Sequence, residues 1–180
     1  MGHKLNNFLF LLKYGSYVTI EAGAWVEPAV HIKPFYKNAN KLKVVLKKHS
    51  YIKRNSIIQG SGYFELGENS YISSFCVIGV NEKIIIGKDV MIADNVSLRD
   101  TDHVFENIDI PMRNQGIKTA PIVIEDNVWI GHGAVITKGV TIGTGSIIGA
   151  NAVVTNNVPP HSVCAGVPAK VIKSRLNTDA

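Results

Sequence analysis

An aliphatic residue recurs at every sixth position through the C-terminal part of the chain. The residues at these lead positions are Ile124, Ile130, Ile136, Ile142, Ile148 and Val154. A small or aliphatic residue follows four positions after each: Val128, Ala134, Val140, Ser146, Ala152 and Val158. Neither the 3.6-residue period of an α-helix nor the two-residue period of a β-strand explains this spacing. It is typical of a parallel β-helix, in which each hexad forms one flat face of a coil.

The same period extends towards the N-terminus in blocks of three hexads. Their lead residues are Ile20, Val26 and Ile32; Leu46, Ile52 and Ile58; Leu66, Ile72 and Ile78; and Ile86, Ile92 and Leu98. Successive blocks are offset by a multiple of six plus two residues, which predicts short bulges or loops between them. We therefore expect an all-β fold and a single domain over 1–180. Its parts are an N-terminal cap over 1–17, a β-helix over 18–158 and a C-terminal cap and tail over 159–180.

The largest interruption of the period lies between Leu98 and Ile124, which are 26 residues apart. It predicts a loop extruded from the coil at about 99–121, and long extrusions from a regular scaffold usually carry function. This loop contains His103, with Asp100 and Asp102 close to it in sequence. Imidazole is suited to proton transfer near neutral pH, and a neighbouring carboxylate can orient it. From spacing alone, a catalytic histidine and a solvated one both remain open.

The net charge of +5 is unevenly distributed, because residues 28–64 contain eight basic residues and no acid. The basic residues are Lys33, Lys37, Lys41, Lys43, Lys47, Lys48, Lys53 and Arg54. They could attract an anionic polymer, a phosphorylated substrate or an acidic membrane surface, or they could serve only as solubilising charge. We expect no nucleic-acid partner, because no recognisable binding module is present.

Three further features bear on assembly and location. Cys76 and Cys164 are expected as two buried thiols. The apolar run 8–12 is too short to span a bilayer, so we interpret it as a capping helix with at most peripheral membrane contact and expect a cytoplasmic location. Trp129, Val135, Ile147 and Val153 occupy outward positions, which predicts a covered face and a homo-oligomer.

Four sequence blocks carry a resemblance to a known family. They are 126–131 (Asp-Asn-Val-Trp-Ile-Gly), 139–143 (Gly-Val-Thr-Ile-Gly), 149–155 (Gly-Ala-Asn-Ala-Val-Val-Thr) and 165–172 (Ala-Gly-Val-Pro-Ala-Lys-Val-Ile). Together they resemble the hexapeptide-repeat acetyltransferases, above all the sugar O-acetyltransferases: the galactoside, maltose and nodulation-factor enzymes and the polysaccharide-modifying branch. The resemblance, strong over about 84–176, implies a left-handed parallel β-helix. It also implies a homotrimer with active sites between subunits, acetyl-CoA as co-substrate and no metal.

The resemblance assigns the catalytic role to His103 and implies direct acetyl transfer. His103 would accept the proton of a sugar hydroxyl while that oxygen attacks the thioester carbonyl. Asp100 and Asp102 are the candidates for orienting the imidazole, and the choice between them stays open. Neither cysteine is needed as a covalent nucleophile.

The resemblance also implies contacts to the cofactor and to the acceptor. The cofactor-binding candidates are Trp129, His132, Ala150, Thr155, Asn156, Lys170 and Lys173. Asn156 stands where the family often has lysine, and 170 and 173 are lysines where arginines are common, so we expect weaker contact with the CoA phosphates. The acceptor candidates are Ser73, Asn81 and Asn114.

The acceptor positions depart from those of the galactoside-type enzymes. The first of them is usually Asn and the second Asp, where this chain has Ser73 and Asn81. The N-terminal helical segment of the maltose and galactoside enzymes is also missing. The two substitutions argue for an acceptor different from that of the galactoside-type enzymes, and the missing segment favours the polysaccharide-modifying branch. The acceptor is therefore expected to be a sugar of a surface polysaccharide or its precursor, and the basic stretch hints at an anionic one.

Three alternatives compete with a sugar O-acetyltransferase. The first is an N-acetyltransferase acting on an amino sugar, and the second is a non-catalytic β-helix scaffold. The third is a zinc carbonic anhydrase built on the same helix, which needs three histidines at a subunit interface. His103 and His132 are 29 residues apart and no His-x4-His motif exists, so the sequence argues against the third.

Overall fold

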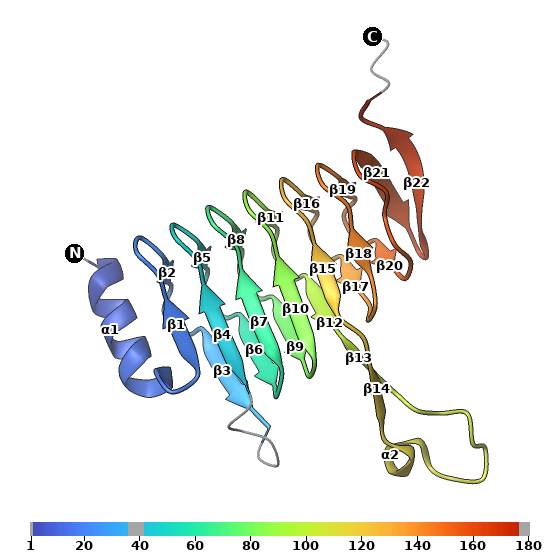
Figure 1. The fold of residues 1–180 in the computed structure, drawn as a ribbon, viewed down its shortest axis with the longest axis horizontal. Helices are drawn as coiled ribbons and strands as arrows, with labels where there is room; N and C mark the ends of the chain where they lie inside the picture. The colour runs from blue at the N-terminus through green and yellow to red at the C-terminus, as the bar shows by residue number, and fades with distance from the viewer. Residues whose placement is uncertain (1, 36–41, 177–180) are drawn as a thin grey trace.

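The computed structural model describes residues 2–35 and 42–176, which form a parallel β-helix. Each complete coil contributes one short strand to each of three sheets, whose strands run parallel except for the last strand of the chain, which is antiparallel to its neighbour. Figure 1 shows the coils stacked in a row, with helix α1 (Gly2–Tyr14) at one end and the last two strands at the other. The basic residues Lys37 and Lys41 lie outside the described residues.

The strands of each sheet come from successive coils. The first sheet consists of β1 (Val18–Ile20), β4 (Lys43–Leu46), β7 (Tyr63–Leu66), β10 (Lys83–Ile86), β15 (Ile122–Ile124) and β18 (Thr141–Ile142). The second consists of β2 (Trp25–Val26), β5 (Tyr51–Ile52), β8 (Tyr71–Ile72), β11 (Met91–Ile92), β16 (Trp129–Ile130), β19 (Ile147–Ile148), β21 (Ser162–Gly166) and β22 (Ala169–Ser174). The third consists of β3 (His31–Pro34), β6 (Ile57–Gly60), β9 (Val77–Val80), β12 (Ser97–Arg99), β17 (Val135–Ile136) and β20 (Val153–Val154).

The lead residues of the hexads stack directly on one another in the core. In the first sheet Leu66 pairs with Ile86, Ile86 with Ile124, and Ile124 with Ile142. Each of these side chains is at most 1% exposed. Full burial of an aliphatic side chain contributes about 1.5–3 kcal/mol, so the repeated stacking is the main source of stability. The period of six is therefore the pattern of the core, and the predicted β-helix is confirmed.

The two-residue offsets between blocks are corner insertions. Residues 61–62 join β6 to β7, and residues 81–82 join β9 to β10, each time at the corner between the third and the first sheet. Each insertion sits beside the equivalent one in the next coil, because Tyr63 N–H donates to the Glu82 carbonyl oxygen at 3.0 Å. The predicted loops between these blocks are confirmed. The third offset, between Ile32 and Leu46, includes residues outside the described ranges.

The corners satisfy their polar groups through residues suited to tight turns. Among the described residues, ten other than glycine have positive φ, and five of these are asparagine, whose short polar side chain tolerates this backbone region. Buried serines bind the corner backbone: Ser70 Oγ accepts the N–H of Val90 at 2.8 Å and donates to the carbonyl of Gly87 at 2.7 Å. Within the described ranges, every buried side-chain nitrogen and oxygen has a hydrogen-bond partner.

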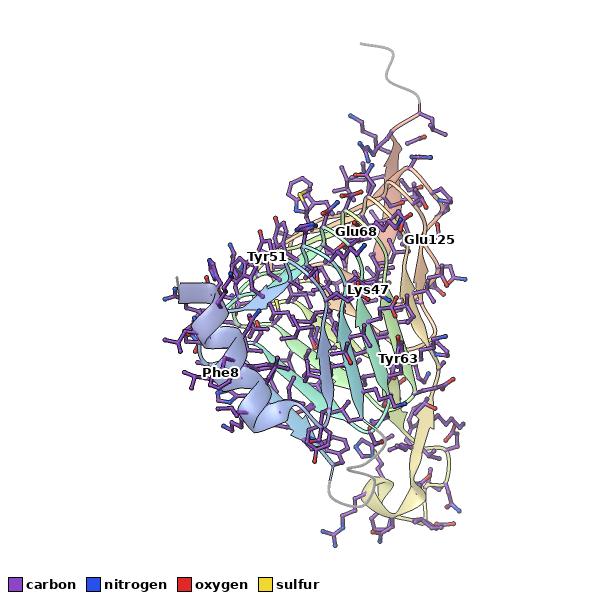
Figure 2. The ribbon with its side chains drawn as sticks, turned by 60° about the vertical axis from the view of Figure 1, so that its left-hand side comes forward. Phe8, Lys47, Tyr51, Tyr63, Glu68 and Glu125 are labelled. Carbon is purple, nitrogen blue, oxygen red and sulfur yellow. The ribbon has the colours of Figure 1, made fainter. Side chains whose placement is uncertain are left out.

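The outward positions of the second sheet form an aromatic row. Trp25 and Tyr51 stack with ring centroids 4.5 Å apart, and Tyr51 and Tyr71 stack at 5.1 Å. Met91 pairs with Tyr71 on one side and with Trp129 on the other, so the row continues towards the C-terminal coils. The rings of Trp25, Tyr51 and Tyr71 thus cover each other's faces; Figure 2 labels Tyr51 in this row.

Helix α1 covers the open end of the first coil. Phe10 and Tyr14 are buried against the coil, and the Asn7 side chain donates to the Ala24 carbonyl at 2.8 Å and accepts from the Val26 N–H at 3.1 Å. Phe8 faces away from the coils (Figure 2). No helix in the described part of the chain is long and apolar enough to cross a membrane.

The two cysteines are free and buried, as predicted. Burial raises the pKa of the Cys76 thiol to about 11, so this sulfur stays protonated and unreactive at neutral pH.

Adjacent isoleucines of β10 offer a test of the core. Ile86→Ala removes a buried side chain and should lower the free energy of unfolding by about 2–5 kcal/mol. Ile85, which points outward from the same strand and is half-buried, is the matched control. Denaturant titration of both variants should show a clearly smaller loss for Ile85→Ala; equal losses would contradict the assignment of Ile86 to the core.

Candidate active site

The predicted extruded loop is a two-stranded arm. The chain leaves the third sheet after β12, forms β13 (Thr101–His103) and returns through β14 (Ile117–Thr119), which pairs antiparallel with β13. A short helix, α2 (Met112–Gln115), lies towards the far end, and Figure 1 shows the arm projecting away from the coils. His103 pairs with Ile117 across the two strands, so its backbone is held by the returning strand.

A hollow of about 670 Å³ lies where the arm leaves the coils. His103 lines the hollow from the side of the arm, and residues of the third sheet and its corners line the opposite side. Its lining residues are Phe35, Gln59, Ser61, Gly79, Asn81, Arg99, Thr101, Asp102, His103 and Ile117. The hollow is wide enough for a sugar-sized molecule, and it brings the predicted residues His103, Asp102 and Asn81 together.

Asp100 is fully buried and fastens the root of the arm to the coils. Its carboxylate accepts the backbone N–H groups of Asn81 at 2.9 Å, Glu82 at 2.8 Å and Lys83 at 2.9 Å, and the hydroxyl of Thr101 at 2.7 Å. Both oxygens are thus occupied by the corner between β9 and β10. Within the described residues Asp100 makes no hydrogen bond to His103, so the structure gives it a positioning role for the whole arm.

Asn81 is fixed beside His103 by the same network. Its side-chain amide donates to Thr101 Oγ1 at 2.9 Å, and Thr101 in turn donates to Asp100. The side-chain oxygen of Asn81 accepts a long hydrogen bond from the Ser61 hydroxyl at 3.5 Å, so the amide has a defined orientation and its oxygen can accept one further hydrogen bond.

Asp102 points towards the next coil. Its carboxylate pairs with Lys138 Nζ at 3.0 Å and its side chain is half exposed. The His103 side chain is exposed and has no hydrogen-bond partner among residues 2–35 and 42–176. Neither predicted orienting carboxylate is bonded to the imidazole, which is presented directly to the hollow.

The other predicted acceptor residues do not line this hollow. Ser73 is buried at a corner of the second sheet, where its hydroxyl donates to Asp94 at 2.5 Å. This hydroxyl and the backbone N–H of Ser74 hold the pKa of the Asp94 carboxyl below its usual value. Asn114 belongs to α2, in the outer part of the arm.

The predicted cofactor residues lie on the C-terminal coils, away from the hollow of the same chain. Trp129 is 47% exposed in the outward row of the second sheet. His132 and Ala150 occupy successive coils at one corner, where the His132 carbonyl accepts the N–H of Asn151 at 2.7 Å. Thr155 and Asn156 are exposed after β20, and Lys170 and Lys173 lie on β22.

The basic stretch does not form one patch. Lys47 pairs with Glu21 at 3.1 Å, and Arg54 pairs with Glu27 at 3.0 Å. Lys33 lies on the third sheet and Lys43 on the first. Where the structure describes it, the stretch is therefore dispersed over several faces and partly neutralised.

Several residues of the hollow were missed from the sequence, although the period contained a signal for them. Gln59, Gly79 and Arg99 each follow a lead residue of the third sheet, and the strand register places them in one outward row. Reading the positions after each lead residue would have grouped them. Phe35 and Ser61 lie in irregular segments, where no period applies.

Among the described residues, no three His, Cys, Asp or Glu side chains lie close enough together to hold a metal ion.

Comparison with known proteins places the chain among transferases. The family described as "Bacterial transferase hexapeptide (six repeats)" matches residues 121–156. Galactoside O-acetyltransferase of Escherichia coli K12 is 36% identical over 164 residues, covering 91% of this chain and 66% of the relative. A putative lipopolysaccharide biosynthesis O-acetyl transferase, WbbJ, of the same organism is 34% identical over 121 residues, covering 63% of this chain and 62% of the relative.

The solved structures agree. A galactoside acetyltransferase in complex with coenzyme A has a TM-score of 0.63 and 31% identity, with 97% of this chain and 73% of that chain covered. The matches to the curated relatives span between 41% and 66% of the relatives' own lengths. On these similarities, the chain belongs to the hexapeptide-repeat transferase family, and its coils form the left-handed parallel β-helix of that family.

Proposed function

We propose that this chain is an acetyl-CoA-dependent O-acetyltransferase acting on a saccharide, with His103 as general base. The observation that carries the proposal is the exposed imidazole at the root of the arm, facing a hollow whose neighbouring polar groups are fixed. The galactoside and lipopolysaccharide relatives support a carbohydrate acceptor, such as a surface polysaccharide or its precursor. The coenzyme A complex of the galactoside enzyme supports acetyl-CoA as donor.

The reaction needs no covalent intermediate on the protein. An acceptor hydroxyl bound beside Asn81 attacks the thioester carbonyl while His103 takes its proton. The carbon–sulfur bond then breaks, and the imidazolium returns the proton to the leaving thiolate of CoA. An alcohol is a poor nucleophile at neutral pH, so the base is the group on which the rate depends most.

We further propose that the site is completed by a second copy of the chain in a homotrimer. The hollow with His103 and the surface with Trp129 and His132 lie on different parts of one subunit. A heterologous contact that closes into a ring would bring the arm of one copy to the C-terminal coils of the next. Val135, Ile147 and Val153 are half-buried and point outward from the C-terminal coils. They give the surface that would contact the next subunit an apolar character.

Replacing the base tests the proposal. His103→Ala should lower kcat for CoA release about 100- to 10,000-fold, with the trimer intact by light scattering. His49→Asn is the control: this histidine lies at a distant corner with φ of 58°, which asparagine tolerates, and the variant should keep full activity. Full activity of His103→Ala would contradict the role of His103 and require another base, whereas a wild type that releases no CoA with any acceptor would favour a non-catalytic scaffold. A loss much smaller than 100-fold with an amino sugar would favour N-transfer, because amines need less help from a base.

The roles of Asp100 and Asp102 can be distinguished by the effect of each on the free energy of unfolding. Asp100→Asn places an amide group against three backbone N–H donors in a buried corner and should lower the free energy of unfolding by about 1–3 kcal/mol. Asp102→Asn removes an exposed ion pair and should cost at most about 1 kcal/mol. Urea titration of both variants measures these two losses. A larger loss of unfolding free energy for Asp102→Asn would contradict the positioning role of Asp100.

The departure at Asn156 gives a test on the donor side. We expect Asn156→Lys to lower the KM for acetyl-CoA, because a cation is added where the proposal brings the phosphates of CoA. The gain should shrink as ionic strength rises, while kcat with saturating donor stays unchanged. Asn156→Gln is the uncharged control, and the same gain in that variant would exclude a charge effect.

A further inference from the structure

Arg99 occupies a defined place in the hollow. It is the last residue of β12, at the point where the arm departs. Strand register puts Gln59, Gly79 and Arg99 in one row across the outer face of the third sheet, and all three line the hollow with His103. A cation at this point therefore shares one space with the candidate base.

The Arg99 side chain lies along the sheet, over Gly79. A Cβ atom added to Gly79 would be 3.3 Å from Nη1 of Arg99 and 3.8 Å from its Cγ and Cδ. Gly79 is buried as a result, although its position faces outward. Arg99 is exposed, so its guanidinium lies along the floor of the hollow and stays accessible to a ligand.

Arg99 has no carboxylate partner in the described part of the chain. The ion pairs there involve other basic residues, and Lys138 takes the nearby Asp102. Asp100 is turned into the corner of residues 81–83. Residues 36–41, which follow Phe35 in the sequence, contain no Asp or Glu. Among residues 2–35 and 42–176, the positively charged guanidinium in the hollow is therefore left without a counter-charge.

We propose that Arg99 forms an anion-binding subsite, so that the acceptor carries a carboxylate or phosphate group as well as the hydroxyl that is acetylated. This inference rests on the proposed function. Guanidinium matches both anions with two parallel N–H donors, and Gln59 in the same row adds an amide donor. Phe35 and Ile117 supply apolar surface for the carbon face of a sugar ring.

The subsite replaces the basic stretch as the reason to expect an anionic acceptor. Of the basic residues of that stretch that the structure describes, only Lys33 is placed beside the row by strand register, next to Gln59. The charge that matters for selectivity is Arg99, which lies outside the stretch and was not singled out from the sequence.

The test compares acceptors that differ only in charge. Digalacturonate and its dimethyl ester are offered to the full-length chain with acetyl-CoA, and UDP-galactose serves as a phosphate-bearing probe. We expect a higher kcat/KM for the acid than for the ester, and a 10- to 100-fold loss for the acid alone in Arg99→Gln. Arg99→Lys should be intermediate, and Arg113→Gln, on the exposed helix α2, should behave as wild type. An Arg99-dependent preference for UDP-galactose instead would identify phosphate as the recognised anion.

Three results would overturn the inference. The first is an equal rate for acid and ester in the wild type, and the second is an equal loss for both in Arg99→Gln. The third is dissociation of the oligomer in Arg99→Gln, because it would show that Arg99 binds a second copy of the chain. Direct binding of the probes, followed by calorimetry on wild type and Arg99→Gln, separates this inference from the proposed function. If no acceptor is acetylated, the proposed function fails. Tighter binding of the acid than of the ester, lost in Arg99→Gln, would still support the subsite.

Discussion

Stacking of identical aliphatic positions is the interaction on which the rest of this structure depends. Each coil is too thin to enclose a core alone, and its inward side chains become buried only against the coils above and below. The ladder through Leu66, Ile86, Ile124 and Ile142 shows how strict this is, because every member is at most 1% exposed. A solenoid built this way is stabilised by contacts between neighbours, so its regular part provides a rigid surface for less regular elements.

The arm is joined to that surface by a single buried carboxylate. The Asp100 side chain accepts three backbone N–H groups of the preceding corner, and its backbone carbonyl accepts the N–H of Ala120, directly after the returning strand, at 3.0 Å. Both ends of the arm are thereby tied to one residue. The candidate base, three residues further on, takes its position from this attachment, which is how a residue can matter for a site without touching what binds there.

The sequence predicted the coils well because burial acts directly on the period. Even the two-residue offsets at 61–62 and 81–82 could be anticipated, since each returns the next lead residue to the core. The site was less predictable. Spacing identified His103 and the extent of the arm, but the direction of each carboxylate depends on donors from other coils, which for Asp100 are 17 to 19 residues away. The period could have grouped Arg99 with Gln59 and Gly79, but it could not show that the Arg99 side chain lies over Gly79 of the neighbouring coil.

The pairing of β10 with β15 has a consequence for how such proteins diversify. Ile84 and Ile86 stand opposite Ile122 and Ile124 as though no residues intervened, although the whole arm lies between them. The entropy of closing a loop grows only logarithmically with its length, so doubling the insertion would cost about 0.6 kcal/mol. Arms of different length and composition can therefore be exchanged at this corner with little effect on the scaffold, and acceptor preference can change independently of fold stability.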